Sequence, residues 1–230
     1  MKNYLRRFLY KFLTFFADRE KLIFLLADDR EKALLEFKTS GYLHDIGWTN
    51  TISTKNVADK DNKPLPWVTY PYIAFIANRL NTSMKVFEFG SGGSTLYYAA
   101  RVARIDSVEH DQKWFEQTRS RMPANVGLNY CELSVDDNDY SNFASKSGEK
   151  YDLIIIDGRD RVNCCINSFS ALSEAGVLVL DDTERDEYLP AAQFLTQNGF
   201  RRIDFWGLAP CITYLKCTTI FYRGDNCLNI

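Results

Sequence analysis

Short apolar runs alternate with amphipathic stretches from residue 67 to the end of the chain. Five of these runs predict successive strands, at residues 85–89, 105–109, 128–133, 151–157 and 176–181. The intervening stretches predict helices, from residue 94 and at residues 111–121, 161–173 and 186–198, with another at 70–80 before the first strand. This order predicts an α/β fold with a mostly parallel sheet that is covered by helices on both faces.

The last two predicted strands, residues 200–206 and 218–222, follow a different pattern. The loop between them, residues 207–216, contains no helical stretch. Parallel neighbours need a crossover connection, so these strands are expected to pair as an antiparallel hairpin or with the second strand inserted antiparallel.

The first 66 residues differ from the rest of the chain. Two helices are expected before residue 40, the second near residues 19–37, and residues 41–66 are rich in polar residues and end with two prolines. We therefore divide the chain into an N-terminal extension, or lid, of residues 1–66 and an α/β domain of residues 67–230.

Residues 1–17 predict a basic amphipathic helix without a cleavage pattern or a membrane span. Its basic residues are Lys2, Arg6, Arg7 and Lys11, and its apolar residues are Leu5, Phe8, Leu9, Phe12 and Phe16. We expect this helix to pack on the protein or on a second subunit. A weak contact with anionic lipid, at the inner face of the membrane, is the alternative for this otherwise cytoplasmic protein.

Composition excludes several classes of function. A net charge of -2 over 230 residues gives no indication of a nucleic-acid partner. The six cysteines form no C-x-x-C pair, which argues against a zinc ribbon or a thioredoxin-type centre. With only His44 and His110 in the chain, a histidine metal site or a Ser-His-Asp triad is not expected.

A glycine-rich turn joins the first strand to the next helix, in the sequence KVFEFGSGGST at residues 85–95. Glycines here let the backbone approach a ligand closely, at the edge where doubly wound sheets bind cofactors. The residues expected around the cofactor are Glu88, Gly90, Ser91, Gly92, Ser94 and Thr95. An acid two residues before the first glycine repels a pyrophosphate but attracts a cationic amino-acid group or a sulfonium, which favours S-adenosylmethionine over NAD.

A second acid, Glu109, ends the second predicted strand and is followed by His110. It lies 19 residues after Gly90, the position from which a carboxylate grips the ribose hydroxyls. A single Gly-x-Gly turn is weak evidence, but the two acids around it make the pattern more specific.

These motifs resemble those of the class I S-adenosylmethionine-dependent methyltransferases. EFGSGGS is similar to the family's first motif with Ser94 in place of the last glycine, and VEHD and YDLIIIDG are similar to its second and strand-four motifs. The resemblance covers residues 67–223. It implies a Rossmann-like fold with a seven-stranded sheet whose last strand is antiparallel, and it places Trp67 and Tyr70 as candidates for the cofactor pocket, with packing as the alternative.

Three carboxylates are expected to meet where the fourth and fifth strands end: Asp157, Asp181 and Asp182. Oxygen ligands of this kind suit Mg²⁺ or another divalent ion. The pattern is similar to that of catechol O-methyltransferase and its metal-dependent relatives, except that Asp182 stands where they have Asn. Pairing with Arg159 or Arg161 is the alternative to a metal.

The combined pattern predicts an enzyme that transfers a methyl group from S-adenosylmethionine. Asp157 or Asp182 is the candidate base, Arg159 is a further candidate catalytic residue, and a sugar or small-molecule hydroxyl is the preferred acceptor. Two alternatives stay open. One is an aminopropyltransferase-like enzyme on the same fold, and the other is a catalytically silent binding or membrane-associated domain.

Overall fold

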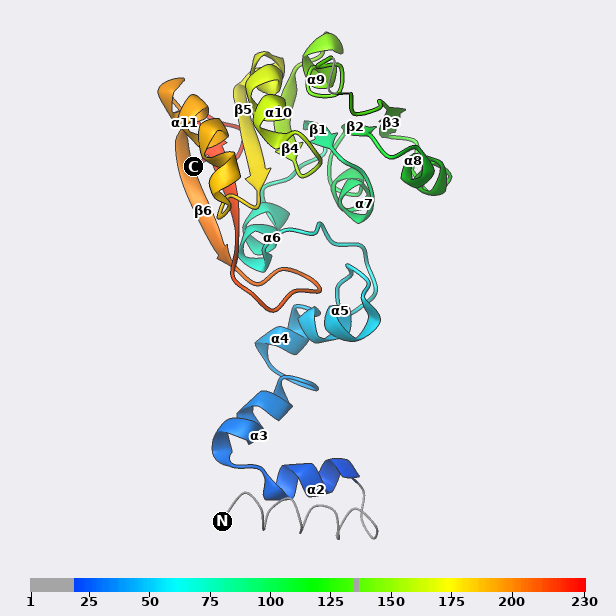
Figure 1. Cartoon of the computed structure of the whole chain (residues 1–230), viewed down its shortest axis with the longest axis vertical. Helices are drawn as coiled ribbons and strands as arrows, with labels where there is room; N and C mark the ends of the chain where they lie inside the picture. Colours follow the sequence, from blue (N-terminus) through cyan, green and yellow to red (C-terminus); the bar gives the residue numbers. More distant parts are fainter. Residues whose placement is uncertain (1–18, 135–136) are drawn as a thin grey trace.

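The computed structural model describes residues 19–134 and 137–230, which form a seven-stranded sheet and its helices (Figure 1). The strands are β1 (Lys85–Phe89), β2 (Arg104–Glu109), β3 (Val126–Tyr130), β4 (Tyr151–Ile156), β5 (Leu172–Asp181), β6 (Arg201–Gly207) and β7 (Lys216–Tyr222). Their order is β3-β2-β1-β4-β5-β7-β6, with β7 antiparallel to both β5 and β6. The predicted Rossmann-like fold with an antiparallel last strand is confirmed.

Alternate residues of the central strands serve two separate cores. Val86, Leu153 and Ile155 pack in one core, while Phe87 and Ile154 pack in the other. The first core is covered by α6 (Tyr70–Ala77) and α7 (Gly93–Ala99), and the second by α9 (Phe143–Lys146), α10 (Arg161–Ser168) and α11 (Leu189–Gln197). Because both faces of the strands are buried, nearly every residue of β4 is apolar.

The helix after β2 and two short turns complete the domain. They are α8 (Gln112–Arg119), η1 (Phe169–Ala171) and η2 (Asp186–Tyr188). The predicted helix at 161–173 ends earlier, because the chain enters η1 at Phe169 and β5 at Leu172. The polar stretch of residues 137–148 contains α9 and places Tyr140 in the core.

The predicted helix at residues 19–37 is two helices, α2 (Arg19–Leu26) and α3 (Asp29–Glu36). Asp28 separates them. Its carboxylate accepts a hydrogen bond from the Glu31 backbone at 2.9 Å, and the Glu31 side chain accepts one from the Asp28 backbone at 2.9 Å. This reciprocal cap starts a new helix and so ends the previous one.

The segment at 41–66 was expected to be irregular, but it contains α4 (Tyr42–Asp45) and α5 (Trp48–Thr54). The α5 helix is fastened to the β6–β7 loop, since Trp48 Nε1 donates to Ile212 O at 2.7 Å and Cys211 N donates to Thr51 Oγ1 at 2.9 Å. These contacts place part of the extension beside the sheet's carboxyl edge.

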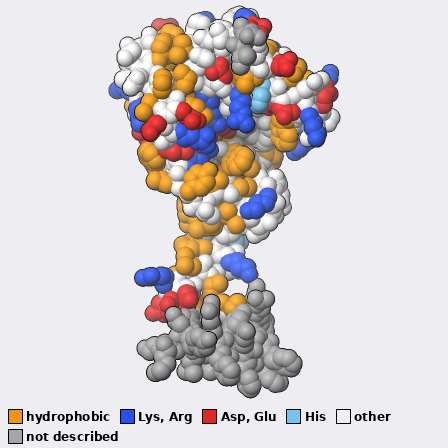
Figure 2. Space-filling model, in the orientation of Figure 1, with side chains coloured by type: hydrophobic (Ala, Val, Ile, Leu, Met, Phe, Trp, Pro, Cys, Tyr) orange, Lys and Arg blue, Asp and Glu red, His pale blue; other side chains and the backbone are white. Residues whose placement is uncertain are grey.

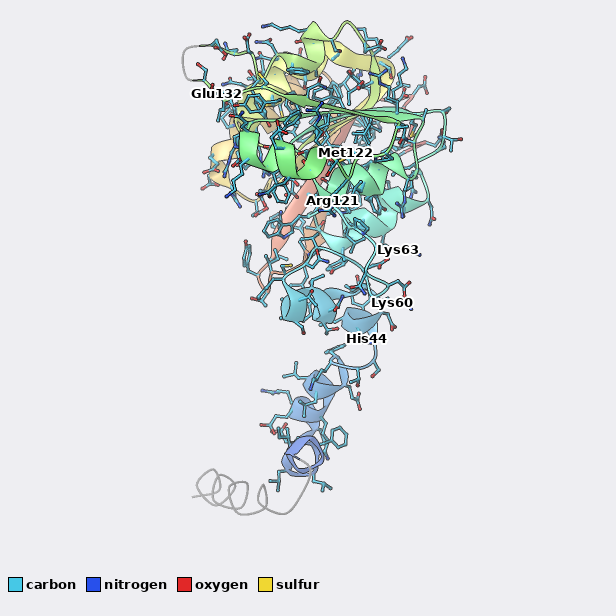
Figure 3. All side chains as sticks on the ribbon, turned by 90° about the vertical axis from the view of Figure 1, so that its right-hand side faces the viewer. His44, Lys60, Lys63, Arg121, Met122 and Glu132 are labelled. Carbon is cyan, nitrogen blue, oxygen red and sulfur yellow. The ribbon has the colours of Figure 1, made fainter. Side chains whose placement is uncertain are left out.

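The helices α2 and α3 extend away from the sheet domain (Figures 1 and 3), beyond α4 with His44 and the loop that carries Lys60 and Lys63. No helix among residues 19–134 and 137–230 is long and apolar enough to cross a membrane. The amphipathic helix expected at residues 1–17 lies outside the described residues.

Candidate functional site

The glycine turn between β1 and α7 has the backbone conformation that its sequence predicts. Gly90 has φ of 102° and Gly92 has φ of 148°, values that side-chain-bearing residues rarely adopt. The Gly92 N–H donates to Thr95 Oγ1 at 2.9 Å. The Thr95 hydroxyl in turn donates to Glu88 Oε2 at 2.6 Å. These two hydrogen bonds therefore fix the turn on the buried side, where Glu88 lies.

Glu88 lies beneath this turn and does not project into the crevice. Its side chain is buried, and Ser107 Oγ lies 3.3 Å from the same carboxyl oxygen, Oε2. Burial raises the pKa of Glu88 to about 7, against the opposing effect of the Ser94, Thr95 and Ser107 hydroxyls. The acid thus supports the turn through Thr95, and its attraction of a cationic ligand stays a prediction of the sequence.

Glu109 lies beside the turn, at the end of β2. Its Oε2 accepts from Ser91 Oγ at 2.9 Å, and its Oε1 accepts from the backbone N–H groups of His110 and Asp111 at 2.9 and 3.0 Å. His110 Nδ1 lies 2.9 Å from the same Oε1. These contacts fix the carboxylate next to Ser91, so the structure brings together the two halves of the predicted cofactor site.

Trp114, on α8, joins this site although the sequence did not indicate it. Its Nε1 donates to Ser91 O at 2.9 Å, and a Cβ placed on Gly92 would lie 3.5 Å from its ring. The side chain is 43% exposed, so one part of the indole packs on the turn and another part is open to a ligand. The feature of the sequence that could have indicated this role is the position of Trp114, five residues after Glu109.

The three predicted carboxylates do meet at the ends of β4 and β5. Arg161 lies among them: Nη2 is 3.0 Å from Asp157 Oδ1, and Nη1 is 3.2 Å from Asp182 Oδ2 and 3.7 Å from Asp181 Oδ2. Arg185 Nη2 is 2.9 Å from Asp182 Oδ2. Burial, reinforced by the neighbouring Asp181, raises the pKa of Asp157 well above its usual range.

Lys216, the first residue of β7, supplies a third cation that the sequence did not reveal. Its Nζ contacts Asp181 Oδ2, lies 2.9 Å from Asp182 Oδ1 and donates to Trp67 O at 3.1 Å. Burial alone would lower the pKa of Lys216, but the surrounding carboxylates raise it, so the ammonium stays protonated. A single lysine at the start of the buried run KCTTIFY was the signal in the sequence.

These pairs decide between the two explanations of the acidic cluster. Each carboxylate already contacts a cationic side chain, and among the described residues no group of His, Cys, Asp and Glu is arranged to hold a metal ion. The residues therefore do not fit the divalent ion that the resemblance implied. Arg161 provides the expected pairing. Arg159 is exposed and makes no ion pair with these acids.

The two aromatic candidates have different surroundings. Trp67 is 52% exposed, and its Nε1 donates to Pro210 O at 2.7 Å, which places it beside Lys216 at the edge of the acidic cluster. Tyr70 is buried, and its hydroxyl faces Thr51 of α5. Burial raises the pKa of Tyr70 to about 12. Tyr70 therefore packs the extension on the domain, which was the alternative to a place in the cofactor pocket.

Comparisons with known proteins agree with this architecture. A precorrin-6y methyltransferase from Geobacter metallireducens superposes with a TM-score of 0.52 and 13% identity, covering 74% of this chain and 92% of that one. An rRNA methylase from Streptococcus thermophilus gives 0.51 and 17%, over 66% and 93%. A Streptococcus mutans protein assigned as a methyltransferase, solved in complex with SAH, gives 0.50 and 13%, over 67% and 99%.

No protein-family model matches the sequence, and the search of curated proteins also finds no match. At these low identities the structural likeness establishes the fold alone. The chain has the seven-stranded fold of the class I S-adenosylmethionine-dependent methyltransferases, and its structural neighbours are enzymes of that type.

Proposed function

We propose that the protein binds S-adenosylmethionine over the Gly90–Gly92 turn and transfers its methyl group to an acceptor. The observation that carries this proposal is the position of Glu109, whose carboxylate is held beside the turn by Ser91 and two backbone N–H groups. A carboxylate fixed there accepts hydrogen bonds from both ribose hydroxyls, while the glycines admit the amino-acid part of the cofactor.

The acidic cluster lies next to this place because β4 neighbours β1. The residue after Asp157 is Gly158, and a Cβ placed on Gly90 would lie 3.5 Å from its Cα. Asp157 has a side chain that is 19% exposed, the most accessible of the three acids. With a pKa raised by burial, Asp157 is the carboxylate best suited to take a proton from an acceptor hydroxyl.

The chemical step is an in-line displacement. The acceptor oxygen forms a bond to the methyl carbon, the carbon–sulfur bond breaks, and its electron pair neutralises the sulfonium as S-adenosylhomocysteine leaves. The hydroxyl proton passes to Asp157 or, through the same cluster, to Asp182. Holding oxygen, methyl carbon and sulfur in line is the main contribution of the protein, since orientation alone accelerates such reactions strongly.

The surface beside the cluster supports a small-molecule or sugar acceptor. Figure 2 shows Lys and Arg side chains gathered among acidic ones on one face of the domain, with hydrophobic side chains directly below them. Trp67, Tyr214 and Leu215 are more than half exposed. Leu215 immediately precedes Lys216, and the Trp67 carbonyl oxygen accepts a hydrogen bond from the Lys216 ammonium. An apolar rim beside polar groups suits a compact acceptor with one flat face.

Calorimetry with S-adenosylmethionine tests the proposal. Glu109→Gln removes one charged acceptor, which is expected to weaken binding by about 1.5–3 kcal/mol, or roughly ten- to a hundredfold. Glu116→Gln, on the exposed side of α8, is the matched control and should bind as the unchanged protein does. If Glu109→Gln binds S-adenosylmethionine as tightly as the unchanged protein, Glu109 does not contact the cofactor.

The same measurement separates the other two functions. Tighter binding of the decarboxylated cofactor than of S-adenosylmethionine would favour an aminopropyltransferase. The absence of binding to either compound would favour a catalytically silent domain.

A further inference from the structure

Three oxygens converge on the ammonium group of Lys216. They are Asp181 Oδ2, Asp182 Oδ1 at 2.9 Å and the Trp67 carbonyl oxygen at 3.1 Å. Two carboxylates and a backbone carbonyl are the ligands that hard divalent cations take in proteins. Lys216 is only 6% exposed, so its charge is placed in a buried cation position that two separate segments, the end of β5 and the main chain at Trp67, have built.

The remaining oxygens of these two acids are also occupied. Thr218 Oγ1 donates to Asp181 Oδ1 at 2.7 Å, while Arg161 and Arg185 lie 3.2 and 2.9 Å from Asp182 Oδ2. Three cationic side chains thus face three carboxylates in the cluster, including Asp157. A divalent ion would add positive charge beside three cationic side chains, and it would meet the Lys216 ammonium between the three oxygens.

The backbone of Asp182 supports the same interpretation. Its φ of 61° lies in the left-handed region, which is unfavourable for residues other than glycine and is less so for Asp and Asn. In this conformation Oδ1 faces Lys216 and Oδ2 faces the two arginines. The backbone of the turn after β5 is therefore strained, and in this conformation the Asp182 carboxylate contacts cationic side chains.

We propose that Lys216 is the built-in counter-cation of this site, and that its ammonium takes the place of the divalent ion that the acidic motif implied. The inference rests on the proposed function, because it makes methyl transfer by this chain independent of a metal. Lys216 acts as a positioning residue. Its ammonium joins the end of β5, the start of β7 and the Trp67 main chain, so the acids and the apolar rim keep one arrangement.

Titration with Mn²⁺ alone, followed by electron paramagnetic resonance of the free ion, tests this proposal without any acceptor. Lys216→Ala removes both the charge and the side chain that fills the site, and leaves the three oxygens facing a water-sized space. We expect it to bind one Mn²⁺ at least tenfold more tightly than the unchanged protein. Lys216→Arg keeps the charge and should bind no more than the unchanged protein.

The double variant Asp181→Asn/Lys216→Ala is the matched control, and it should lose the gained affinity because one of the three oxygen ligands is no longer charged. Binding of S-adenosylhomocysteine by each variant reports separately on the glycine turn, so a failed methyltransferase proposal is distinguished from a failed Lys216 proposal.

Two results would overturn the inference. The first is stoichiometric Mn²⁺ binding by the unchanged protein that Asp181→Asn abolishes, which needs no Lys216 variant to fold. The second is a Lys216→Ala protein that binds S-adenosylhomocysteine normally yet binds no Mn²⁺. Should Lys216→Ala not fold, Lys216→Ser repeats that measurement with a small polar side chain.

Discussion

A single chain of hydrogen bonds connects the buried carboxyl of Glu88 to the glycine turn. Glu88 Oε2 accepts from Thr95, and Thr95 accepts from the Gly92 N–H. Ser107 contributes from the neighbouring strand, where its hydroxyl donates to Gly90 O at 2.7 Å. The geometry of the Gly90–Gly92 turn therefore depends on the protonation and the shape of buried groups that lie behind it.

Glu88 makes stability depend on pH in a defined direction. Its pKa is raised by burial from 4.5 to about 7, so the folded state binds this proton more strongly than the unfolded state. The contribution of Glu88 to the free energy of unfolding should therefore fall as pH rises from 4.5 to 7, by about 3 kcal/mol, and should be constant above that range. Glu88→Gln cannot lose a proton, so the difference between variant and unchanged protein should grow by this amount across the window.

Urea unfolding at half-unit pH steps measures that difference. Because both proteins share every other titrating group, the subtraction isolates Glu88 from the acids of the β4–β5 cluster. A difference that is constant from pH 4 to 8 would show that Glu88 has an ordinary pKa in the folded protein.

Thr95 tests the same chain from its centre. Thr95→Val keeps the shape but removes the donor to Glu88 and the acceptor for the Gly92 N–H, so a buried N–H is left unpaired and Glu88 loses its shortest hydrogen bond. The expected loss in the free energy of unfolding is about 2–3 kcal/mol, with weaker binding of S-adenosylhomocysteine by calorimetry. Thr95→Ser keeps the hydroxyl and should retain the affinity, so equal behaviour of the two variants would contradict this role.

At the scale of the elements, the site depends on how closely the ends of β1 and β4 approach. The Asp157 N–H donates to Phe89 O at 3.3 Å, and a Cβ added to Gly158 would lie 3.0 Å from the Phe89 backbone and 2.3 Å from the Tyr140 hydroxyl oxygen. Glycine at position 158 therefore lets the acidic cluster of β4 lie directly beside the turn of β1.

Gly158→Ala should disturb this approach. Overpacking of this kind destabilises by about 1–3 kcal/mol, and here it should also move Asp157 away from the turn. Tyr140→Phe removes the oxygen with the closest contact, so the double variant should recover at least about 0.5 kcal/mol relative to the sum of the single changes. Thermal or urea unfolding of all four proteins measures the coupling, and strictly additive losses would place the strain elsewhere.

At the scale of the whole molecule, the features that could be predicted from the sequence are those that local patterns determine. The mostly parallel sheet followed from the alternation of elements, and Glu109 and the Gly90–Gly92 turn could be placed because each lies where a strand ends. The break before α3 was visible in the Asp28–Glu31 spacing, but it was missed. Lys216 and Trp114 could not be assigned, because their contacts with Asp181 and Ser91 join segments that are distant in the sequence and depend on tertiary packing.

The N-terminal extension divides into parts with different relations to the domain. The α3 helix has no buried residue, and among the side chains that the structure describes neither core includes one from α2 or α3. Phe24, Leu25 and Leu34 are between 46% and 76% exposed. In contrast, Trp48 packs against the first core and bonds to Ile212, and Thr51 is fully buried. We therefore expect the folded unit to begin before α4, while the division at residue 66 stays a prediction of the sequence.

Stepwise truncation measures this boundary. Removing α2 and α3, by comparing residues 19–230 with 39–230, should change the melting temperature by less than about 2 °C, because little buried surface is lost.

Removing α4 and α5 as well, in 57–230, breaks the Trp48 and Thr51 hydrogen bonds and uncovers Tyr70. Each kcal/mol lost should lower the melting temperature by about 2–4 °C, so a drop of several degrees is expected at this second step. The step from the full chain to 19–230 examines the helix expected at residues 1–17, for which internal packing predicts a loss of stability. A large drop on removing α2 and α3 alone would mean that these helices are part of the folded domain.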